Sequence, residues 1–298
     1  MELEEAVKEY LLDLKDRKKS KETITSWEKK LQRFVEFAKR KGVENVVDID
    51  PSHIKSFMRW RSETCQPNSV NLELRMLNAM FNYIIRFFRG KVINENPANV
   101  LYVGRLEEEQ KSMKAFSKED IKKLLNLYNG DSFYDVRNKT IFMLLIETGI
   151  RISDVMNLES NNVFEEVIKI EKGKGKKTRF VAVSYKLRKQ LNLYERARKA
   201  FMTESKCSYY FVSKTKKQLK KGSLQHVEKA IHDMVNIEGC FHNFRRFFGQ
   251  DMYKRNRDVY AISKLLGHSK VNVTEVYLNS IEDTEILKVG MDSPLSNM

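Results

Sequence analysis

Apolar residues in the first part of the chain recur at the spacing of an amphipathic α-helix. Four such stripes lie at residues 3–14, 24–38, 54–58 and 74–84. Each stripe predicts a helix with one apolar face. Pro51 is a typical helix start, and Gly42 and Gly90 are typical helix stops. Because short amphipathic helices are stabilised mainly by burying that face, the four are expected to pack as one compact bundle over residues 1–105.

A change of pattern follows this predicted bundle. Residues 106–116 are mostly polar and are predicted to be a linker. Ser117 and Asp120 have the spacing of a capping box, which predicts that a new helix begins there. A chain of 298 residues is long enough for two domains, so a second domain is expected over residues 117–298.

The second part of the chain mixes helical and strand-like patterns. A helix is predicted over residues 134–148, and two strand-like runs follow at 167–171 and 179–183. The segment between these runs is rich in glycine and lysine, which is typical of a hairpin. Helical patterns then resume after residue 185. The predicted fold class is therefore mainly α with a small antiparallel β-sheet in the second domain.

Basic residues exceed acidic residues in both parts of the chain. Lys and Arg number 55 against 40 Asp and Glu, a formal net charge of +15; residues 1–105 hold 20 and 15 of them, which leaves 35 and 25 for the rest. This distribution suits a protein that binds a polyanion with both domains, and it favours nucleic acid as the partner. A lysine-rich solvated surface or an anionic membrane surface would also account for the charge alone.

Cysteine usage and hydropathy narrow the class of protein further. Cys65, Cys207 and Cys240 are far apart and form no CxxC pair, which argues against a disulfide framework and against a zinc site. The acidic, amphipathic start does not resemble a signal peptide, and the longest apolar runs, such as residues 141–146, are too short to span a bilayer. We therefore expect a cytoplasmic protein with no metal site and no membrane partner.

Six residues in the second domain have side chains suited to phosphate chemistry. In chain order they are Arg151, Lys174, His242, Arg245, His268 and Tyr277. Each one alone has an ordinary structural explanation, such as an ion-pair partner, a turn lysine, a helix-end histidine or a core tyrosine. The combination is far more specific: an arginine, a hairpin lysine, the pattern HxxR, the pattern LGH, and a tyrosine nine residues after that histidine.

In the segments TGIRISDVMNL, GKGKKTR, HNFR and LGHSKVNVTEVY the chain resembles the tyrosine recombinase family, which includes the Xer recombinases and the phage integrases. The four-helix first domain resembles the core-binding domain of that family. The resemblance implies a site-specific DNA recombinase that cleaves and rejoins DNA strands through a covalent 3′-phosphotyrosine. One departure is visible, because the family usually continues after the second arginine with His, then Ser or Thr, then Phe, whereas this chain has Arg246, Phe247 and Phe248.

The chemistry of a phosphodiester explains the need for this residue set. Negative charge grows on the non-bridging oxygens in the transition state, and Arg151 and Arg245 can each offer them a planar pair of donors. His268 would add a further hydrogen bond, and His242 lies one helical turn from Arg245. Because the arginines take the role that Mg²⁺ has in nucleases, neither a metal nor any other cofactor is expected.

Tyr277 would be the nucleophile that attacks the phosphorus. A phenol with a pKa near ~10 is almost entirely protonated at neutral pH, so the cationic site must stabilise the phenolate. The phosphotyrosine keeps the energy of the broken bond, so rejoining needs no ATP. The leaving 5′ oxygen needs a proton, for which the resemblance implies Lys174, with Lys176 and Lys177 as alternatives. Asp154 is interpreted as a residue that orients an arginine.

The resemblance also implies the assembly and leaves other functions to be weighed. Double-stranded DNA with a recombination site would be the substrate, bound by a synaptic tetramer. Residues 281–289 could form a short helix that docks on its own domain or, as the family favours, in a neighbouring protomer. A type IB topoisomerase uses a similar residue set, but the helical first domain and the spacing from LGH to tyrosine favour a recombinase. A DNA-binding regulator on the same fold would not need the complete set.

Overall fold

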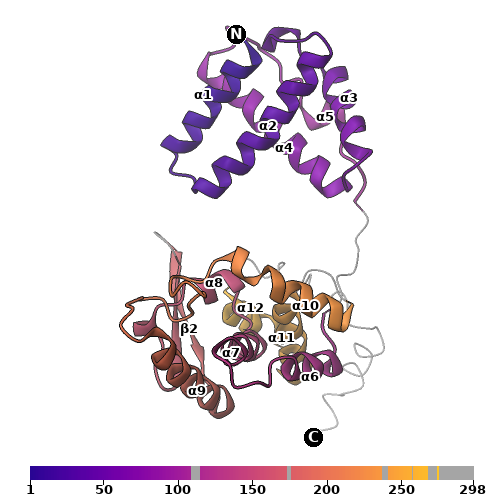
Figure 1. Ribbon diagram of the computed structural model, residues 1–298. Helices are drawn as coiled ribbons and strands as arrows, with labels where there is room; N and C mark the ends of the chain where they lie inside the picture. The colour runs from indigo at the N-terminus through magenta and orange to yellow at the C-terminus, as the bar shows by residue number, and fades with distance from the viewer. Residues whose placement is uncertain (109–114, 173–175, 237–240, 257, 268–273, 275–298) are drawn as a thin grey trace, which may run out of the picture. The chain divides into compact units, whose positions relative to one another are not determined.

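The computed structural model describes residues 1–108, 115–172, 176–236, 241–256, 258–267 and 274. The chain forms two compact units, Met1–Gln110 and Lys111–Met298, each with its own hydrophobic core (Figure 1). Both units are mainly helical, and the second contains a two-stranded antiparallel sheet. The predicted fold class is confirmed.

Unit 1 is built from helices whose starts are set by local hydrogen bonds. Its elements are α1 (Leu3–Asp16), α2 (Lys21–Arg40), the 3-10 turn η1 (Val46–Asp48), α3 (Pro51–Ser62), α4 (Pro67–Phe87) and α5 (Val100–Val103). Ser20 Oγ accepts a hydrogen bond from the backbone N–H of Thr23 at 3.2 Å and caps α2. Asp50 Oδ1 accepts one from the N–H of Ser52 at 2.8 Å and caps α3. The short α5 was not predicted, because four residues are too few for a helical period to be recognised.

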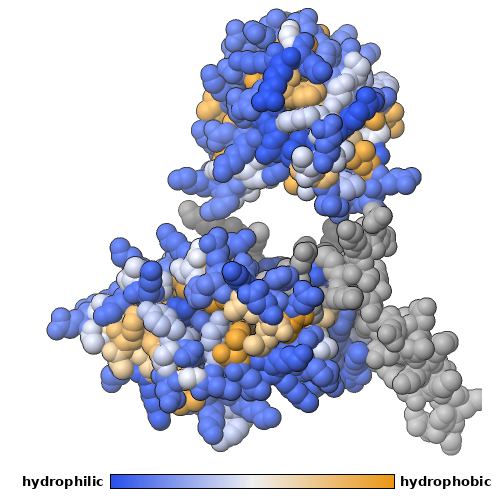
Figure 2. Space-filling model, turned by 45° about the vertical axis from the view of Figure 1, so that its right-hand side comes forward, coloured by the Kyte–Doolittle hydropathy of each residue, from blue (hydrophilic) through white to orange (hydrophobic). Residues whose placement is uncertain are grey.

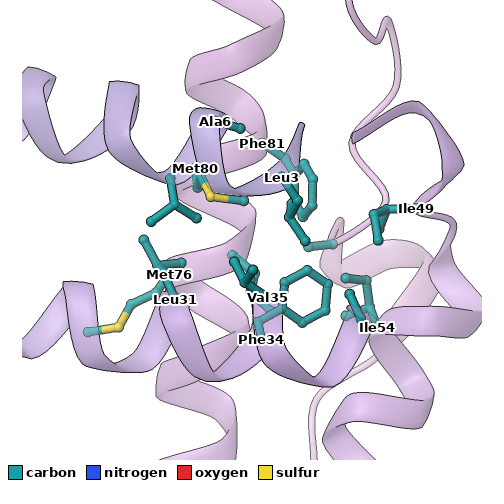
Figure 3. Packing of buried hydrophobic residues seen from close by; sticks show 14 of the residues in the cluster. Leu3, Ala6, Leu31, Phe34, Val35, Ile49, Ile54, Met76, Met80 and Phe81 are labelled. Atoms are coloured by element: carbon teal, nitrogen blue, oxygen red, sulfur yellow. The ribbon is translucent and has the colours of Figure 1, made fainter. Parts of the chain in front are cut away.

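The apolar faces of α1–α4 meet in one core. Phe34 of α2 is fully buried, and its ring meets Phe57 of α3 edge to face with the centroids 5.2 Å apart. Phe81 of α4 contacts the same ring at 6.4 Å. Figure 3 shows Leu3 of α1 and Ile54 of α3 pointing into this interior. All four helices therefore contribute to a single core, as the apolar stripes predicted.

A buried ion cluster lies in the same unit. Glu73 of α4 is 3% exposed, and its Oε1 lies 2.6 Å from Arg33 Nη1. Arg61 donates from Nε to Glu73 Oε2 at 2.8 Å and from Nη2 to Oε1 at 3.1 Å. An unpaired buried carboxylate would strongly destabilise the fold, so the two guanidiniums are needed once Glu73 is buried. The cluster joins α4 to α2 and to α3.

One buried amide holds the end of unit 1. Asn71 of α4 donates from Nδ2 to Leu106 O at 2.9 Å and to Glu108 Oε1 at 2.8 Å. Its Oδ1 accepts from the N–H of Leu106 at 3.0 Å. Leu106 and Glu108, which the sequence assigns to the linker, are therefore bound to α4. Much of the remaining predicted linker, residues 109–114, lies outside the described residues.

Unit 2 begins with the predicted capping box. Ser117 Oγ accepts from the N–H of Asp120 at 3.0 Å, and Asp120 Oδ2 accepts from the N–H of Ser117 at 2.9 Å. The elements that follow are α6 (Lys118–Asn126), α7 (Phe133–Thr148), α8 (Ile152–Met156), η2 (Ser160–Asn162), β1 (Val167–Lys172), β2 (Lys176–Ala182), α9 (Tyr185–Met202), η3 (Lys221–Leu224), α10 (Gln225–Val235), α11 (Phe241–Asn256) and α12 (Val259–Leu266).

The central element of unit 2 is α7, which corresponds to the helix predicted over residues 134–148. Its buried apolar residues do not form a single stripe, because the adjacent pairs Ile141–Phe142 and Leu144–Leu145 are all buried. A helix that is apolar on more than one side must be surrounded by other elements. The helices α9 and α11 pack against α7 and cover it (Figure 1).

The sheet of unit 2 is the predicted hairpin. β1 and β2 are antiparallel, with Ile168 opposite Val181 and Ile170 opposite Arg179. β2 begins at Lys176, earlier than the apolar pattern predicted, because backbone pairing continues through polar residues. The hairpin turn, residues 173–175, lies outside the described residues.

The face of the molecule that Figure 2 shows is mainly hydrophilic. Figure 2 shows polar residues over most of the visible face of each unit, with apolar residues in scattered patches, as is usual for a globular protein. Within the described ranges no helix is both long enough and apolar enough to cross a membrane.

Phe34→Ala is expected to destabilise unit 1. Removal of a fully buried ring leaves a cavity, and the free energy of unfolding should fall by about 3–5 kcal/mol. The matched control is Phe87→Ala at the end of α4, because the Phe87 side chain is 60% exposed and its loss should have a much smaller effect. Denaturant unfolding of the full chain, followed by circular dichroism, measures both variants. A fall in the free energy of unfolding for Phe34→Ala as small as that expected for the exposed control would contradict this packing.

Candidate active site

The turn between α7 and α8 is closely packed by two other helices. Gly149 ends α7 in the left-handed conformation with a φ of +60°. A Cβ at this position would lie 2.5 Å from Phe248 Cδ1 of α11 and 2.8 Å from Leu266 Cδ2 of α12. Only glycine allows both this φ and this close approach. The turn leads directly to Arg151, which is half-buried at the start of α8.

Arg245 of α11 binds the two segments that meet at this turn. Its side chain is 1% exposed. Nη1 donates to Gly149 O and Nη2 donates to Leu266 O, both at 2.7 Å. The last carbonyls of a helix have no partner within the helix, and the negative end of its dipole favours a cation there. Arg245 therefore fixes α11 between the end of α7 and the end of α12.

His242 lies one helical turn before Arg245, and the residue is exposed. Desolvation by the surrounding protein, followed by three nearby positive charges, lowers the pKa of this imidazole from 6.5 to about 4. The charges are those of Arg246, Arg245 and Arg151. All three guanidiniums lie close enough to disfavour a protonated ring. At neutral pH the imidazole is uncharged and can both donate and accept a hydrogen bond.

Arg246 stands at the position where the sequence departs from the family pattern. Its side chain is 8% exposed, and Nη1 donates to Asn243 Oδ1 at 2.8 Å. Of the three arginines, it has the largest charge effect on the pKa of His242. The sequence analysis left open whether Arg246 adds a contact to phosphate. The positive charge of Arg246 lowers the pKa of His242, an effect that the sequence alone did not predict.

Asp154 connects the start of α8 to the sheet. Its Oδ2 accepts from the backbone N–H of Arg151 at 3.2 Å and from Arg179 Nη2 at 2.8 Å. The carboxylate thus does orient an arginine guanidinium, that of Arg179 in β2. Sequence reasoning gave no role to Arg179. The alternation of strand side chains could have pointed to it, because Arg179 lies on the same face of β2 as the buried Val181.

The structure brings together three of the six predicted residues, namely Arg151, His242 and Arg245. The other three, Lys174, His268 and Tyr277, lie outside the described residues, as does the predicted exchange helix at 281–289. The alternative lysines, Lys176 and Lys177, belong to β2.

The gathered side chains form a positively charged site. The charges of three guanidiniums act on one neutral imidazole, and such a concentration of positive charge can attract the oxygens of a phosphate. In the part of the chain that the structure describes, no three His, Cys, Asp or Glu side chains are placed to hold a metal ion. The chemistry that this arrangement supports is the stabilisation of negative charge by fixed donors.

The sequence profile of the phage integrase family matches residues 114–283, more than half of the chain. This chain belongs to the phage integrase family. A second profile, the phage integrase N-terminal SAM-like domain, matches residues 7–86 of unit 1. Together the two matches confirm the family resemblance that the motifs predicted.

The chain is similar to several recombinases and integrases. Tyrosine recombinase XerC of Caldanaerobacter subterraneus subsp. tengcongensis is 26% identical over 262 residues, which cover 85% of this chain and 71% of that protein. The Tn1549 transposon integrase, solved in complex with transposon right end DNA, has a TM-score of 0.77 at 15% identity, over 97% of this chain and 98% of that one. A lambda integrase tetramer bound to a Holliday junction has a TM-score of 0.71 at 13% identity, over 93% and 77%. At these identities the two structures establish the shared fold.

The pKa of His242 is expected to be about 4 in this protein and to rise in Arg246→Gln, because one nearby positive charge is lost. An NMR titration of the imidazole carbons measures both values. The folded state binds this proton less readily than the unfolded state, so stability falls as the pH drops from about 6.5 towards 4 and is unaffected by this group above that window. A wild-type pKa near 6.5, or no change in the variant, would contradict this electrostatic account.

Proposed function

We propose that this protein is a site-specific DNA recombinase that cleaves and rejoins DNA strands through a covalent 3′-phosphotyrosine. The observation that carries the proposal is the convergence of Arg151 with the α11 pair His242 and Arg245 in a member of the phage integrase family. These residues come from separate elements of unit 2. They form a site for an oxyanion that none of the elements would form alone.

Stabilisation of the transition state is the proposed role of the arginines. In the transition state the non-bridging oxygens of the scissile phosphate gain negative charge, and the guanidinium of Arg151 would donate to them, as would the second N–H of a terminal nitrogen of Arg245 that also binds Gly149 O or Leu266 O. The bonds from Arg245 to Gly149 O and Leu266 O fix the plane of its guanidinium before DNA arrives. A preorganised donor loses little free energy in reorientation during the reaction. Neutral His242 can accept or donate a proton at the same phosphate.

The proposed nucleophile is Tyr277, and the proposed acid is Lys174. The phenolic oxygen attacks phosphorus, the bond from phosphorus to the 5′ oxygen breaks, and Lys174 gives that oxygen its proton. The phenolic proton leaves to a nearby base or to water. Rejoining reverses these steps with a 5′ hydroxyl, so the cycle uses neither ATP nor a metal or other cofactor. His268 would add a further hydrogen bond to the phosphate.

Double-stranded DNA carrying a recombination site is the proposed substrate. The basic excess in residues 1–105 and in the rest of the chain supports DNA contacts by both domains. The fold is shared with an integrase solved on transposon end DNA and with one solved as a tetramer on a Holliday junction. We infer that four protomers form a synaptic tetramer on DNA, in which residues 281–289 act between subunits. The proposed compartment is the cytoplasm.

Two alternative functions make different predictions. A type IB topoisomerase would relax any supercoiled plasmid, whereas a recombinase needs its own site and a partner site. A DNA-binding regulator on this fold would form no covalent adduct with any DNA. The family match and the gathered arginines favour the recombinase. Sequencing the DNA trapped on the wild-type protein would identify the site that the following experiments need.

Tyr277→Phe is expected to abolish the covalent complex and to leave DNA binding nearly unchanged, because only the nucleophilic hydroxyl is lost. A duplex with a nick beside the cleavage position traps the wild-type adduct, which is then seen on a denaturing gel. Tyr260→Phe is the control, since the Tyr260 side chain is 61% exposed and Tyr260 is not the proposed nucleophile. Trapping of the Tyr277 variant would assign the nucleophile to another tyrosine.

Arg151→Lys is expected to slow cleavage by about 10²–10³-fold although the charge is kept, because lysine cannot make two parallel hydrogen bonds to one phosphate. The matched control is Arg255→Lys, an exposed arginine that pairs with Asp251 at 2.8 Å and should cleave at the wild-type rate. The rate of adduct formation on the nicked duplex measures both. Cleavage by Arg151→Lys at the control rate would remove Arg151 from the site.

A further inference from the structure

Arg179, in β2, is a charged residue at an inward-facing position. Its side chain is 10% exposed, and it lies on the same face of the strand as the buried Val181. Nε and Nη1 are buried, and neither has a hydrogen-bond partner among the residues that the structure describes. Buried donors without partners reduce stability. These two donors reduce the net stability that the Arg179 side chain contributes, so its role is sought in the segments that its contacts join.

One carboxylate oxygen joins Arg179 to the segment that carries Arg151. Asp154 Oδ2 accepts from Arg179 Nη2 at 2.8 Å and from the backbone N–H of Arg151 at 3.2 Å. The Asp154 side chain is 13% exposed, so solvent and salt screen this ion pair only weakly. Through this oxygen, β2 is held against the beginning of α8.

Arg179 also lies beside the end of α12. Gly267 ends that helix with a φ of +66°, and a Cβ on it would lie 2.9 Å from Nη1 and 3.0 Å from the side-chain Cδ of Arg179. The residue before it, Leu266, accepts the hydrogen bond from Arg245. The guanidiniums of Arg179 and Arg245 therefore both lie at the C-terminal end of α12, where the helix dipole favours cations. In the sequence, His268 follows Gly267 directly.

We propose that Arg179 is a positioning residue for strand cleavage, which holds β2, the strand that follows the proposed acid Lys174 in the sequence, against the start of α8 through Asp154 and beside the end of α12. The inference rests on the proposed function and extends it to a residue outside the predicted set of six. In the sequence Lys174 lies two residues before the start of β2, so a shift of this strand relative to α8 would displace the proposed proton donor. Arg179 needs no contact with DNA for this role.

Two versions of the nicked duplex test the proposal on the full-length protein. The first has an ordinary 5′ bridging oxygen at the cleavage position, and the second has a 5′ bridging sulfur, whose thiolate leaves without a proton. Arg179→Gln should slow cleavage of the first by about 10²-fold, the effect expected from a misplaced reacting group. Cleavage of the second should stay close to the wild-type rate. A fold defect would slow both, so equal slowing on the two DNAs overturns the proposal.

A double-mutant cycle tests whether Arg179 acts through Lys174. Once Lys174 is replaced by Ala, adding Arg179→Gln should slow cleavage of the ordinary DNA little further, because the group that Arg179 positions is already absent. Additive effects would overturn the proposal. Should Arg179→Gln fail to fold, the paired variant Asp154→Asn with Arg179→Gln removes both charges together and replaces it in each measurement.

Arg188→Gln is the matched control for the loss of a buried arginine. Arg188 is 12% exposed and pairs with Glu195 at 2.8 Å, while Nη1 donates to Phe164 O at 2.9 Å. This variant should cleave both DNAs at wild-type rates; preferential slowing on the ordinary DNA would overturn the specific role of Arg179. A wild-type protein that forms no adduct with either DNA overturns the proposed function and this inference together. A reactive wild type with an unrescued Arg179 variant overturns this inference alone.

Discussion

The two hydrogen bonds from the buried guanidinium of Arg245 are the contacts on which the arrangement of the site depends. They bind one carbonyl at the end of α7 and one at the end of α12, two segments far apart in the sequence. Without this side chain both carbonyls would remain buried, and unsatisfied buried acceptors are strongly destabilising. The same residue that is proposed to bind phosphate is therefore also required to build the site, so the site and the core of unit 2 form together.

Much of the fold was predictable because it is encoded locally. Helix boundaries follow from short-range chemistry, such as the capping box of Ser117 and Asp120, and the bundle follows from stripes that must be buried. The features that the sequence did not predict also have physical causes. The start of β2 lies in a polar stretch, where backbone pairing does not need apolar side chains. The attachment of Leu106 to unit 1 depends on Asn71, which is distant in the sequence.

Within the candidate site, the sequence predicted only the residues that belong to the motif. The order of residues indicated that Arg151, His242 and Arg245 would come together, and the structure brings them together. Strand alternation could have placed Arg179 on the inward face of β2, but the sequence could not indicate its pairing with Asp154 or the effect of Arg246 on His242, because both arise from the approach of separate elements. The roles of Lys174, His268 and Tyr277 stay predictions, since these residues lie outside the described ranges.

Salt should affect the buried ion pair of Glu73 and Arg61 much less than it affects contacts between the protein and DNA phosphates. Salt screens exposed charges strongly and buried pairs only weakly, and these two side chains are 3% and 12% exposed. The link between α3 and α4 should therefore persist in concentrated salt, under conditions in which contacts with phosphates weaken through the loss of counterion release. A decline in DNA affinity at high salt would then report on the charges at the protein–DNA interface, and not on loosening of the domain that presents them.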